Sequence, residues 1–183
     1  MAIVSALRKG GFNLYMRHGA ASEGQDTFNA AQTPRWFDDC KLQRNLSALG
    51  QEQARKVGAA LKQLNIRINV VKTSQFCRVR DTAYAMNLGP IEITEDLNHM
   101  MGQRTGFDTN SARYGQLAML PPVGTNVLLI SHTHGSPRGE ERVMGQMQEA
   151  EIVVYQPDAK GLSIPVARIP LADWDVLIKL ANP

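Results

Sequence analysis

The stretch Asn126–Ser131, with the sequence NVLLIS, decides the fold of this 183-residue chain. Its middle is apolar without interruption, which is typical of a strand at the centre of a sheet covered on both faces. Shorter runs of the same kind predict strands at 12–16, 70–71, 91–94, 152–155 and 164–169.

Helical spacing separates these strands. Ala54, Val57, Leu61 and Leu64 recur on one face of a helix predicted over 47–65, with Ser47 as its N-cap. Further helices are expected at 79–86, through Leu120 from an N-cap at Asn110, and at 172–180. The alternation predicts a single α/β domain over residues 1–183, a three-layer sandwich with a mostly parallel central sheet and helices on both faces.

Composition excludes several classes of protein. Hydrophobic residues make up 43% and charged residues 20% of the chain, so it can bury a core. The formal net charge of +3 is too small to indicate binding to nucleic acid. No apolar run approaches the roughly 20 residues of a membrane helix, so no membrane partner is expected. A pI near 9.0 suits an anionic small molecule.

Three long polar stretches, 20–46, 98–110 and 133–150, each follow a predicted strand. Loops of this length in a small domain are commonly functional, and ligands of open α/β sheets bind outside the carboxyl ends of the strands. The pair Trp36-Phe37 within the first stretch is expected to anchor it to the core. The site is therefore predicted at this edge of the sheet.

Four basic side chains follow strands at that edge. Arg17 and His18 close the first strand, Arg78 opens the helix after the second, and His132 follows the central strand. Arginine matches phosphate oxygens with its planar fork, and a histidine among cations stays neutral and nucleophilic. The set predicts a site for phosphoryl transfer.

Each member of the set also has a simpler interpretation. An Arg-His pair is common by chance, Arg78-Val79-Arg80 alone is typical of a solvated helix face, and His132 alone fits a hydrogen-bonded core histidine. Their joint position at successive strand ends favours the functional interpretation.

The order of motifs resembles the histidine phosphatase superfamily, also called phosphoglycerate mutase-like. The matching segments are 14–19 (LYMRHG), 45–50 (NLSALG), 74–78 (SQFCR) and 127–132 (VLLISH). The resemblance implies that His18 is the phosphorylated nucleophile and that Arg17, Arg78 and His132 form the phosphate pocket. It also implies a three-layer α/β fold that requires no metal or other cofactor.

The chain departs from the family at the proton donor. Ala20 and Gly24 replace the usual glutamate and asparagine after the first motif, and Asn98-His99 follows Leu97 where mutases place an acid. Phosphoglycerate mutase activity is therefore not expected. The candidate acids are carboxylates in the first polar stretch or next to the third strand, with His99 as a histidine alternative: Glu23, Asp26, Glu95 and Asp96.

The resulting hypothesis is a phosphatase that hydrolyses phosphomonoesters or related phosphoryl compounds through phosphohistidine on His18. Its expected partner is a small phosphorylated substrate or a phosphohistidine protein. Two alternatives stay open. One is a metal-dependent hydrolase that uses His132 and His134, completed by His18 or His99. The other is a phosphate-ligand binding protein without turnover.

The two cysteines, Cys40 and Cys77, are either free thiols or one disulfide. The resemblance extends to exported members of the family with cysteines at both positions, which favours the disulfide and a periplasmic or exported location over the cytoplasm. Residues 1–7 nevertheless lack the basic leader of a secretory signal.

Overall fold

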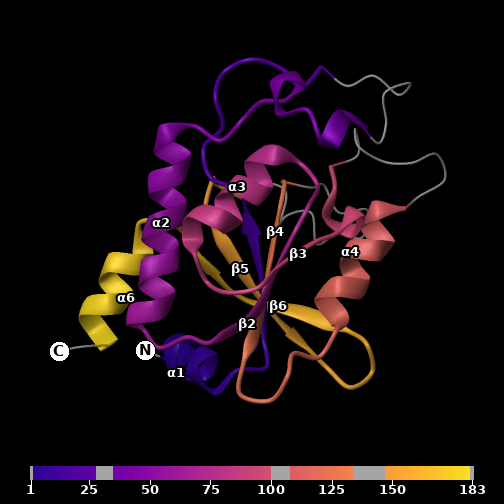
Figure 1. Cartoon of the computed structure of the whole chain (residues 1–183). Coiled ribbons are helices and arrows are strands. Elements are labelled where there is room, and N and C mark those ends of the chain that lie inside the picture. The colour runs from indigo at the N-terminus through magenta and orange to yellow at the C-terminus, as the bar shows by residue number, and fades with distance from the viewer. Residues whose placement is uncertain (1, 28–34, 100–107, 134–146, 182–183) are drawn as a thin grey trace.

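The computed structural model describes residues 2–27, 35–99, 108–133 and 147–181. Six strands form one sheet in the order β3-β2-β4-β1-β5-β6 (Figure 1). Their bounds are β1 Asn13–Arg17, β2 Ile68–Thr73, β3 Ile91–Ile93, β4 Asn126–Ser131, β5 Ile152–Pro157 and β6 Ser163–Ile169. The pairs among β1 to β4 are parallel, whereas β5 pairs antiparallel with both β1 and β6. The predicted mostly parallel sheet is confirmed, and Asn126–Ser131 is one of its two central strands.

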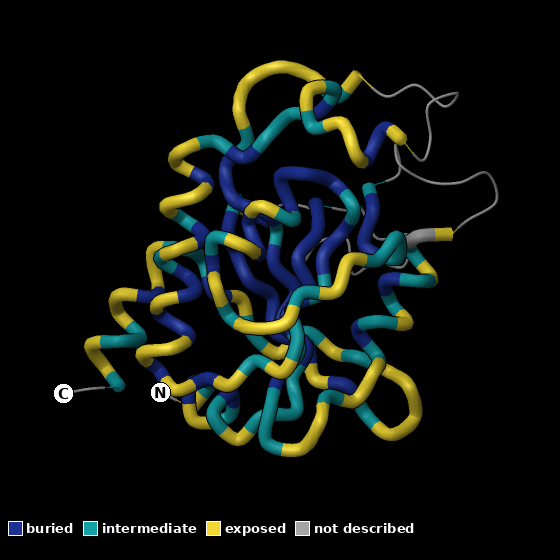
Figure 2. The backbone as a smooth tube through the Cα atoms, in the orientation of Figure 1, coloured by how far each residue is buried: buried dark blue, intermediate teal, exposed yellow. Residues whose placement is uncertain are grey.

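Helices cover both faces of this sheet, as predicted (Figure 1). Among the described residues they are α1 Ala2–Lys9, α2 Ala48–Gln63, α3 Cys77–Met86, α4 Thr109–Ala118 and α6 Asp173–Ala181. Buried side chains of α1, α2, α3 and α6 pack with one face of the strands in the larger core cluster. Leu117 of α4 packs on the other face, with Tyr15, Leu129 and Tyr155. Strands β1, β4 and β5 are consequently buried along most of their length, while the outer turns of the helices are exposed (Figure 2).

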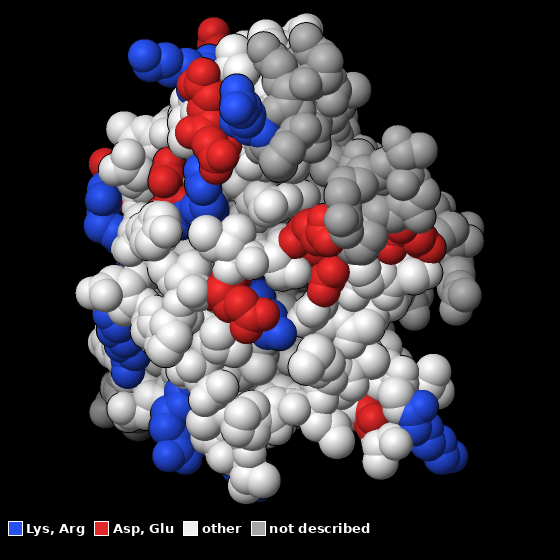
Figure 3. All heavy atoms as spheres, turned by 45° about the vertical axis from the view of Figure 1, so that its right-hand side comes forward, with Lys and Arg blue, Asp and Glu red and all other residues white. Residues whose placement is uncertain are grey.

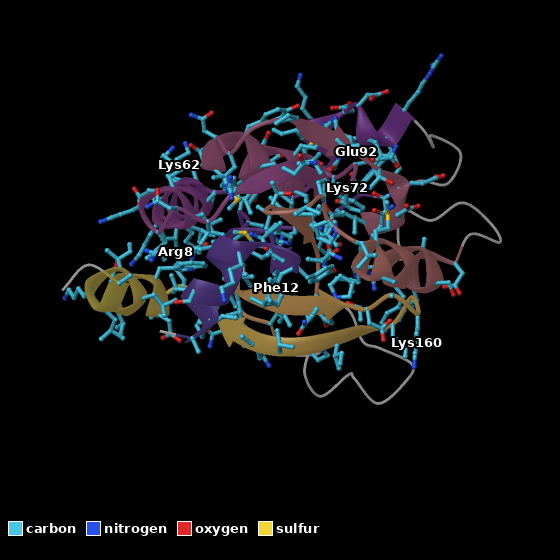
Figure 4. All side chains as sticks on the ribbon, turned by 90° about the horizontal axis from the view of Figure 1, so that it is seen from below. Arg8, Phe12, Lys62, Lys72, Glu92 and Lys160 are labelled. Carbon is cyan, nitrogen blue, oxygen red and sulfur yellow. A yellow bond between two sulfur atoms is a disulfide. The ribbon has the colours of Figure 1, made fainter. Side chains whose placement is uncertain are left out.

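The N-terminal helix α1 was not among the predicted elements. Val4 and Leu7, three positions apart, are both buried against the core. Arg8, labelled in Figure 4, donates from Nε to the carbonyl of Leu64 at 2.7 Å, which ties α1 to the end of α2. In an eight-residue helix, two buried apolar positions are a weak periodic signal, so the sequence did not predict α1.

Capping explains where the helices begin. The Ser47 hydroxyl accepts from the backbone N–H of Gly50, which confirms the predicted N-cap of α2. The cap predicted at Asn110 is wrong, because α4 begins at Thr109 with Asp108 as its cap. The carboxylate of Asp108 accepts from the N–H groups of both Asn110 and Ser111, two donors that have no intrahelical partner.

Strand register brings the predicted site residues to one edge. Arg17 at the end of β1 lies opposite Ser131 at the end of β4, and Thr73 at the end of β2 lies opposite Ile130. The segments that carry His18, Ser74 and His132 therefore leave the sheet side by side, at the carboxyl ends of three parallel strands.

Candidate functional site

Arg78 is the centre of the site. It lies in the first turn of α3, and its side chain is buried rather than on a solvated helix face. Its Nε–H donates to His18 Nε2 at 3.2 Å, and its Nη2 lies 3.5 Å from His132 Nδ1. Its Nη1 pairs with Asp26 Oδ1 at 2.9 Å. One guanidinium thus touches both histidines and one carboxylate.

His18 is held as a neutral imidazole with a defined tautomer. Its Nδ1 lies 2.7 Å from the carbonyl oxygen of Gly19, which can only accept, so Nδ1 carries the proton. Nε2 therefore offers its lone pair, which Arg78 contacts. Burial, together with the charge of Arg78, lowers the pKa of His18 to about 3. The imidazole therefore stays neutral, with its single proton on Nδ1, throughout the neutral and mildly acidic range.

His132 is positioned from three directions. Its Nε2 lies 3.1 Å from the Ser74 hydroxyl, and its backbone carbonyl accepts from the Tyr15 hydroxyl at 2.9 Å. The Phe76 ring packs edge-on against the imidazole, with ring centroids 4.6 Å apart. These contacts turn Nδ1 of His132 toward Arg78, and the His18 and His132 rings lie 5.3 Å apart between centroids.

Arg17 shares the strand end but is directed elsewhere. Its Nη1 donates to the carbonyl of Met147 at 2.8 Å, and its Nη2 lies 3.6 Å from Glu149. Its Nε is buried and has no hydrogen-bond partner within the part of the chain that the structure describes. The charge of Arg17 contributes to the lowered pKa of His18, so it acts on the same site without a direct contact to the other three side chains.

The four candidate acids differ in their contacts and in their exposure to solvent. Asp26 lies at the centre: its Oδ1 accepts from both Arg78 Nη1 and the backbone N–H of Arg44. Glu23 is exposed in the same loop. Asp96 accepts from Gln116 of α4 at 2.5 Å, and Glu95 lies beside it in the short 3₁₀ helix Glu95–Leu97. Asp26 is therefore the candidate acid with a direct contact to Arg78.

The histidine alternative, His99, also lies near the site. Its ring centroid is 5.5 Å from that of His132. Burial and the charge of Arg78 lower the pKa of His99, while Asp26 opposes this effect. His99 is therefore a second group at the site that is able to exchange a proton.

Two residues of the cluster were not predicted from the sequence. Ser74 fixes the ring of His132, and its position at the end of β2 was the available signal. Arg44 accepts from Arg78 through its backbone carbonyl and contributes to the lowered pKa of His18. Nothing in the sequence distinguishes Arg44 from other loop arginines, because the contact runs through its backbone.

A disulfide between Cys40 and Cys77 ties the first polar stretch to the start of α3. Cys77 immediately precedes Arg78, and its backbone N–H donates to the Gln43 side chain at 2.9 Å. Trp36 and Phe37 pack against Phe76 and anchor the same stretch in the core, as predicted. The loop that carries Asp26 and Arg44 is thus attached beside Arg78.

The metal-dependent alternative requires a set of ligands around His132. His134, the second histidine of the His-x-His pair, lies outside the described residues. Both ring nitrogens of His132 are within hydrogen-bond distance of Ser74 or Arg78. Within the described ranges, no group of three or more histidine, cysteine, aspartate or glutamate side chains could hold a metal ion.

The surface of the protein carries charges of both signs, in agreement with the formal net charge of +3. Positive and negative side chains are interspersed over the face drawn in Figure 3. No helix in the described part of the chain is both long enough and apolar enough to cross a bilayer.

The fold and site together define an α/β protein in which a buried arginine contacts two histidines at the carboxyl edge of the parallel strands. The family description "histidine phosphatase superfamily (branch 1)" matches residues 14–115. The chain belongs to this superfamily, as its motifs indicated. No match was found among curated protein sequences.

Solved structures share the fold at low identity. A complex of the protein histidine phosphatase SixA with tungstate is 19% identical, with a TM-score of 0.62 over 88% of this chain and 98% of its own. A putative phosphohistidine phosphatase SixA from Agrobacterium tumefaciens is 14% identical, with a TM-score of 0.58 over 87% and 97%. The alpha-ribazole phosphatase from Shigella flexneri is 14% identical, with a TM-score of 0.58 over 87% and 96%.

Proposed function

We propose that this protein is a phosphatase that works through a phosphohistidine intermediate on His18. The contact of Arg78 with both His18 and His132 carries the proposal, because it places a guanidinium fork beside an unprotonated nucleophile. Membership of the histidine phosphatase superfamily supports the same activity.

The first step is an in-line attack of His18 Nε2 on phosphorus. The Nε2 lone pair forms the N–P bond, and the P–O bond to the leaving group breaks with its electron pair on the leaving oxygen. The Nδ1–H bond to the Gly19 carbonyl keeps Nε2 unprotonated and stabilises the positive charge that the ring gains. In the second step a water oxygen attacks phosphorus, and the N–P electron pair returns to Nε2.

Arg78, His132 and Arg17 stabilise the phosphoryl oxygens. Arg78 and His132 exchange their mutual contact for contacts with the incoming oxygens. Arg17 contributes its Nε–H, a donor that no described residue accepts from. Stabilisation of charge by positioned donors accounts for most of the catalysis in phosphoryl transfer.

Asp26 is the proton donor in this mechanism. Its carboxyl group contacts Arg78, so a phosphate ester held by Arg78 places its leaving oxygen near Asp26. The protonated carboxyl then protonates the leaving oxygen. In the second step the carboxylate takes a proton from the attacking water.

The substrate is a small phosphomonoester or the phosphohistidine of a partner protein. Neighbours with the same fold include a protein histidine phosphatase and an alpha-ribazole phosphatase, which supports both classes. A mutase reaction is not expected, because Asn98 and His99 stand where mutases carry the acid. Phosphohistidine leaves readily without full protonation, whereas an alkyl phosphate depends on the acid.

Trapping the intermediate tests the nucleophile. Brief mixing with a phosphoryl donor should label the protein with phosphate that is labile to acid and stable to alkali, and His18→Ala should abolish the label. Stoichiometric labelling that survives His18→Ala would overturn the mechanism. Tight binding of phosphate or vanadate without hydrolysis of an aryl phosphate would instead identify a binding protein.

Leaving-group dependence tests the acid. Asp26→Asn should lower kcat for an alkyl phosphate by about 10²- to 10⁴-fold and change it little for dinitrophenyl phosphate, whose leaving group needs no proton. Glu23→Gln, in the same loop but exposed, is the matched control. If His99→Gln shows this dependence and Asp26→Asn does not, His99 is the donor.

A further inference from the structure

Arg113 is a buried cation that the proposed mechanism does not use. It projects from α4, is 4% exposed, and lies beside the apolar cluster that contains Tyr15, Leu117 and Tyr155. Its Nη1 donates a hydrogen bond to Asn110 Oδ1 at 3.1 Å. None of the ion pairs in the described part of the chain includes it. Burying a charge in apolar surroundings costs desolvation free energy unless an opposite charge or further hydrogen bonds compensate it.

The unsatisfied atoms of Arg113 lie on one edge of its guanidinium. Nε and Nη2 are both buried and have no hydrogen-bond partner among the described residues, whereas Nη1 donates to Asn110. Nε–H and Nη2–H point the same way in the planar group, and this is the edge that binds two oxygens of a carboxylate or phosphate side by side. Asp108, whose charge acts on Arg113, is already occupied in capping α4.

Arg113 lies close to the phosphate cluster. Its charge contributes to the lowered pKa of His99, whose ring is 5.5 Å from that of His132. The charge of Arg113 also acts on the pKa of Tyr15, opposing the larger effect of burial. The Tyr15 hydroxyl donates to the backbone carbonyl of His132. The charge of Arg113 therefore acts on two residues, His99 and Tyr15, that contact His132 directly.

We propose that the Nε/Nη2 edge of Arg113 binds a second anionic group of the substrate. This group is a carboxylate or a second phosphate on the leaving group. This inference rests on the proposed phosphatase function and narrows its substrate class. The preferred substrates are phosphomonoesters whose alcohol carries a further negative charge. The first anion binds at Arg78 and His18, and the second binds at Arg113.

Binding of non-hydrolysable phosphonates tests the proposal without turnover. Phosphonoacetate, 3-phosphonopropionate and 4-phosphonobutyrate are each compared, by calorimetry, with the alkylphosphonate of the same chain length. At one spacer length or more, the carboxylate should tighten binding to the wild-type protein about 10- to 100-fold. Arg113→Gln should erase this advantage and leave alkylphosphonate binding within about twofold.

Two variants control for effects on folding. Arg113→Lys keeps the charge and loses the fork, so it should retain only part of the carboxylate advantage. Arg55→Gln removes an exposed arginine of α2 and should change nothing. A purely structural role for Arg113 predicts that its variants weaken both members of each phosphonate pair equally and lower the thermal midpoint, which would overturn the proposal.

The remaining outcomes separate this inference from the proposed function. Absence of any carboxylate advantage in a protein that hydrolyses p-nitrophenyl phosphate overturns the Arg113 site alone. Absence of that hydrolysis overturns the phosphatase function. Binding of two equivalents of inorganic phosphate by wild type and one by Arg113→Gln, without a carboxylate advantage, would place a free anion at Arg113 and overturn its assignment to the substrate.

Discussion

The Nε–H of Arg78 donates to Nε2 of His18 across 3.2 Å. The nitrogen proposed to attack phosphorus is thus already the acceptor of a bond from the group proposed to hold the phosphate. An incoming phosphoryl oxygen that takes this donor frees the lone pair at the position where phosphorus arrives. Binding and activation of the nucleophile are therefore the same exchange of hydrogen bonds.

The lowered pKa of His18 predicts a specific dependence of stability on pH. An unfolded chain protonates this histidine below its ordinary pKa of about 6.5, whereas the folded protein keeps it neutral down to about pH 3. The contribution of His18 to the free energy of unfolding is constant above pH 6.5. Between pH 6.5 and 3 it falls as the pH is lowered, by at most about 1.4 kcal/mol for each pH unit.

Urea unfolding of wild type and His18→Asn at several pH values between 4 and 8 measures this effect. The asparagine variant does not titrate at this position, so its stability should fall less on acidification. Parallel curves for the two proteins would show that His18 is not held neutral in the folded state.

The Cys40–Cys77 disulfide predicts a loss of stability on reduction. It closes a segment with a sequence separation of 37 residues, which corresponds to about 3–4 kcal/mol of the free energy of unfolding. Urea unfolding with and without dithiothreitol measures the loss. The double variant Cys40→Ser/Cys77→Ser should reproduce it and should not respond to the reductant, which separates bond cleavage from other effects of the reagent.

Much of the fold follows from periodicity in the sequence, and the exceptions have physical reasons. The apolar run of β4 and the stripe of α2 indicate their elements directly, because burial imposes those patterns. The cap of α4 was misplaced by two residues, since Asp108 and Asn110 both suit an N-cap and only the backbone path decides between them.

The position of the site could also be predicted from the sequence, whereas the contacts of several of its side chains could not. The strand-end rule brought Arg17, His18, Arg78 and His132 to one edge because parallel strands share their carboxyl ends. It could not give the direction of the Arg17 side chain, which depends on the backbone of residue 147, more than a hundred residues away in sequence. Likewise, the partners of Asp26 and Arg113 depend on how loop and helix pack on the sheet.

Ser74 is predicted to act through His132. Ser74→Ala removes the hydroxyl 3.1 Å from Nε2 and allows the imidazole to turn away from Arg78. We expect kcat to fall about 3- to 30-fold, with a loss of roughly 1 kcal/mol in the free energy of unfolding. Ser163→Ala on β6 is the control, because the buried Ser163 hydroxyl has no partner to lose. Equal kinetic effects of the two substitutions would rule out a positioning role for Ser74.

Two glycine substitutions test how tightly α2 packs beneath the nucleophile. A Cβ on Gly50 would lie 2.2 Å from the carbonyl oxygen of Ala20, two residues after His18, so Gly50→Ala must displace backbone next to the site. We expect a loss of about 1–3 kcal/mol in the free energy of unfolding, with reduced kcat. On α4, a Cβ on Gly115 would meet nothing within 4 Å, so Gly115→Ala should instead raise stability by up to about 1 kcal/mol. Urea unfolding of both variants checks the opposite signs. A Gly50→Ala protein as stable and active as wild type would show that the end of β1 tolerates movement, and would remove packing by α2 as a constraint on the position of His18.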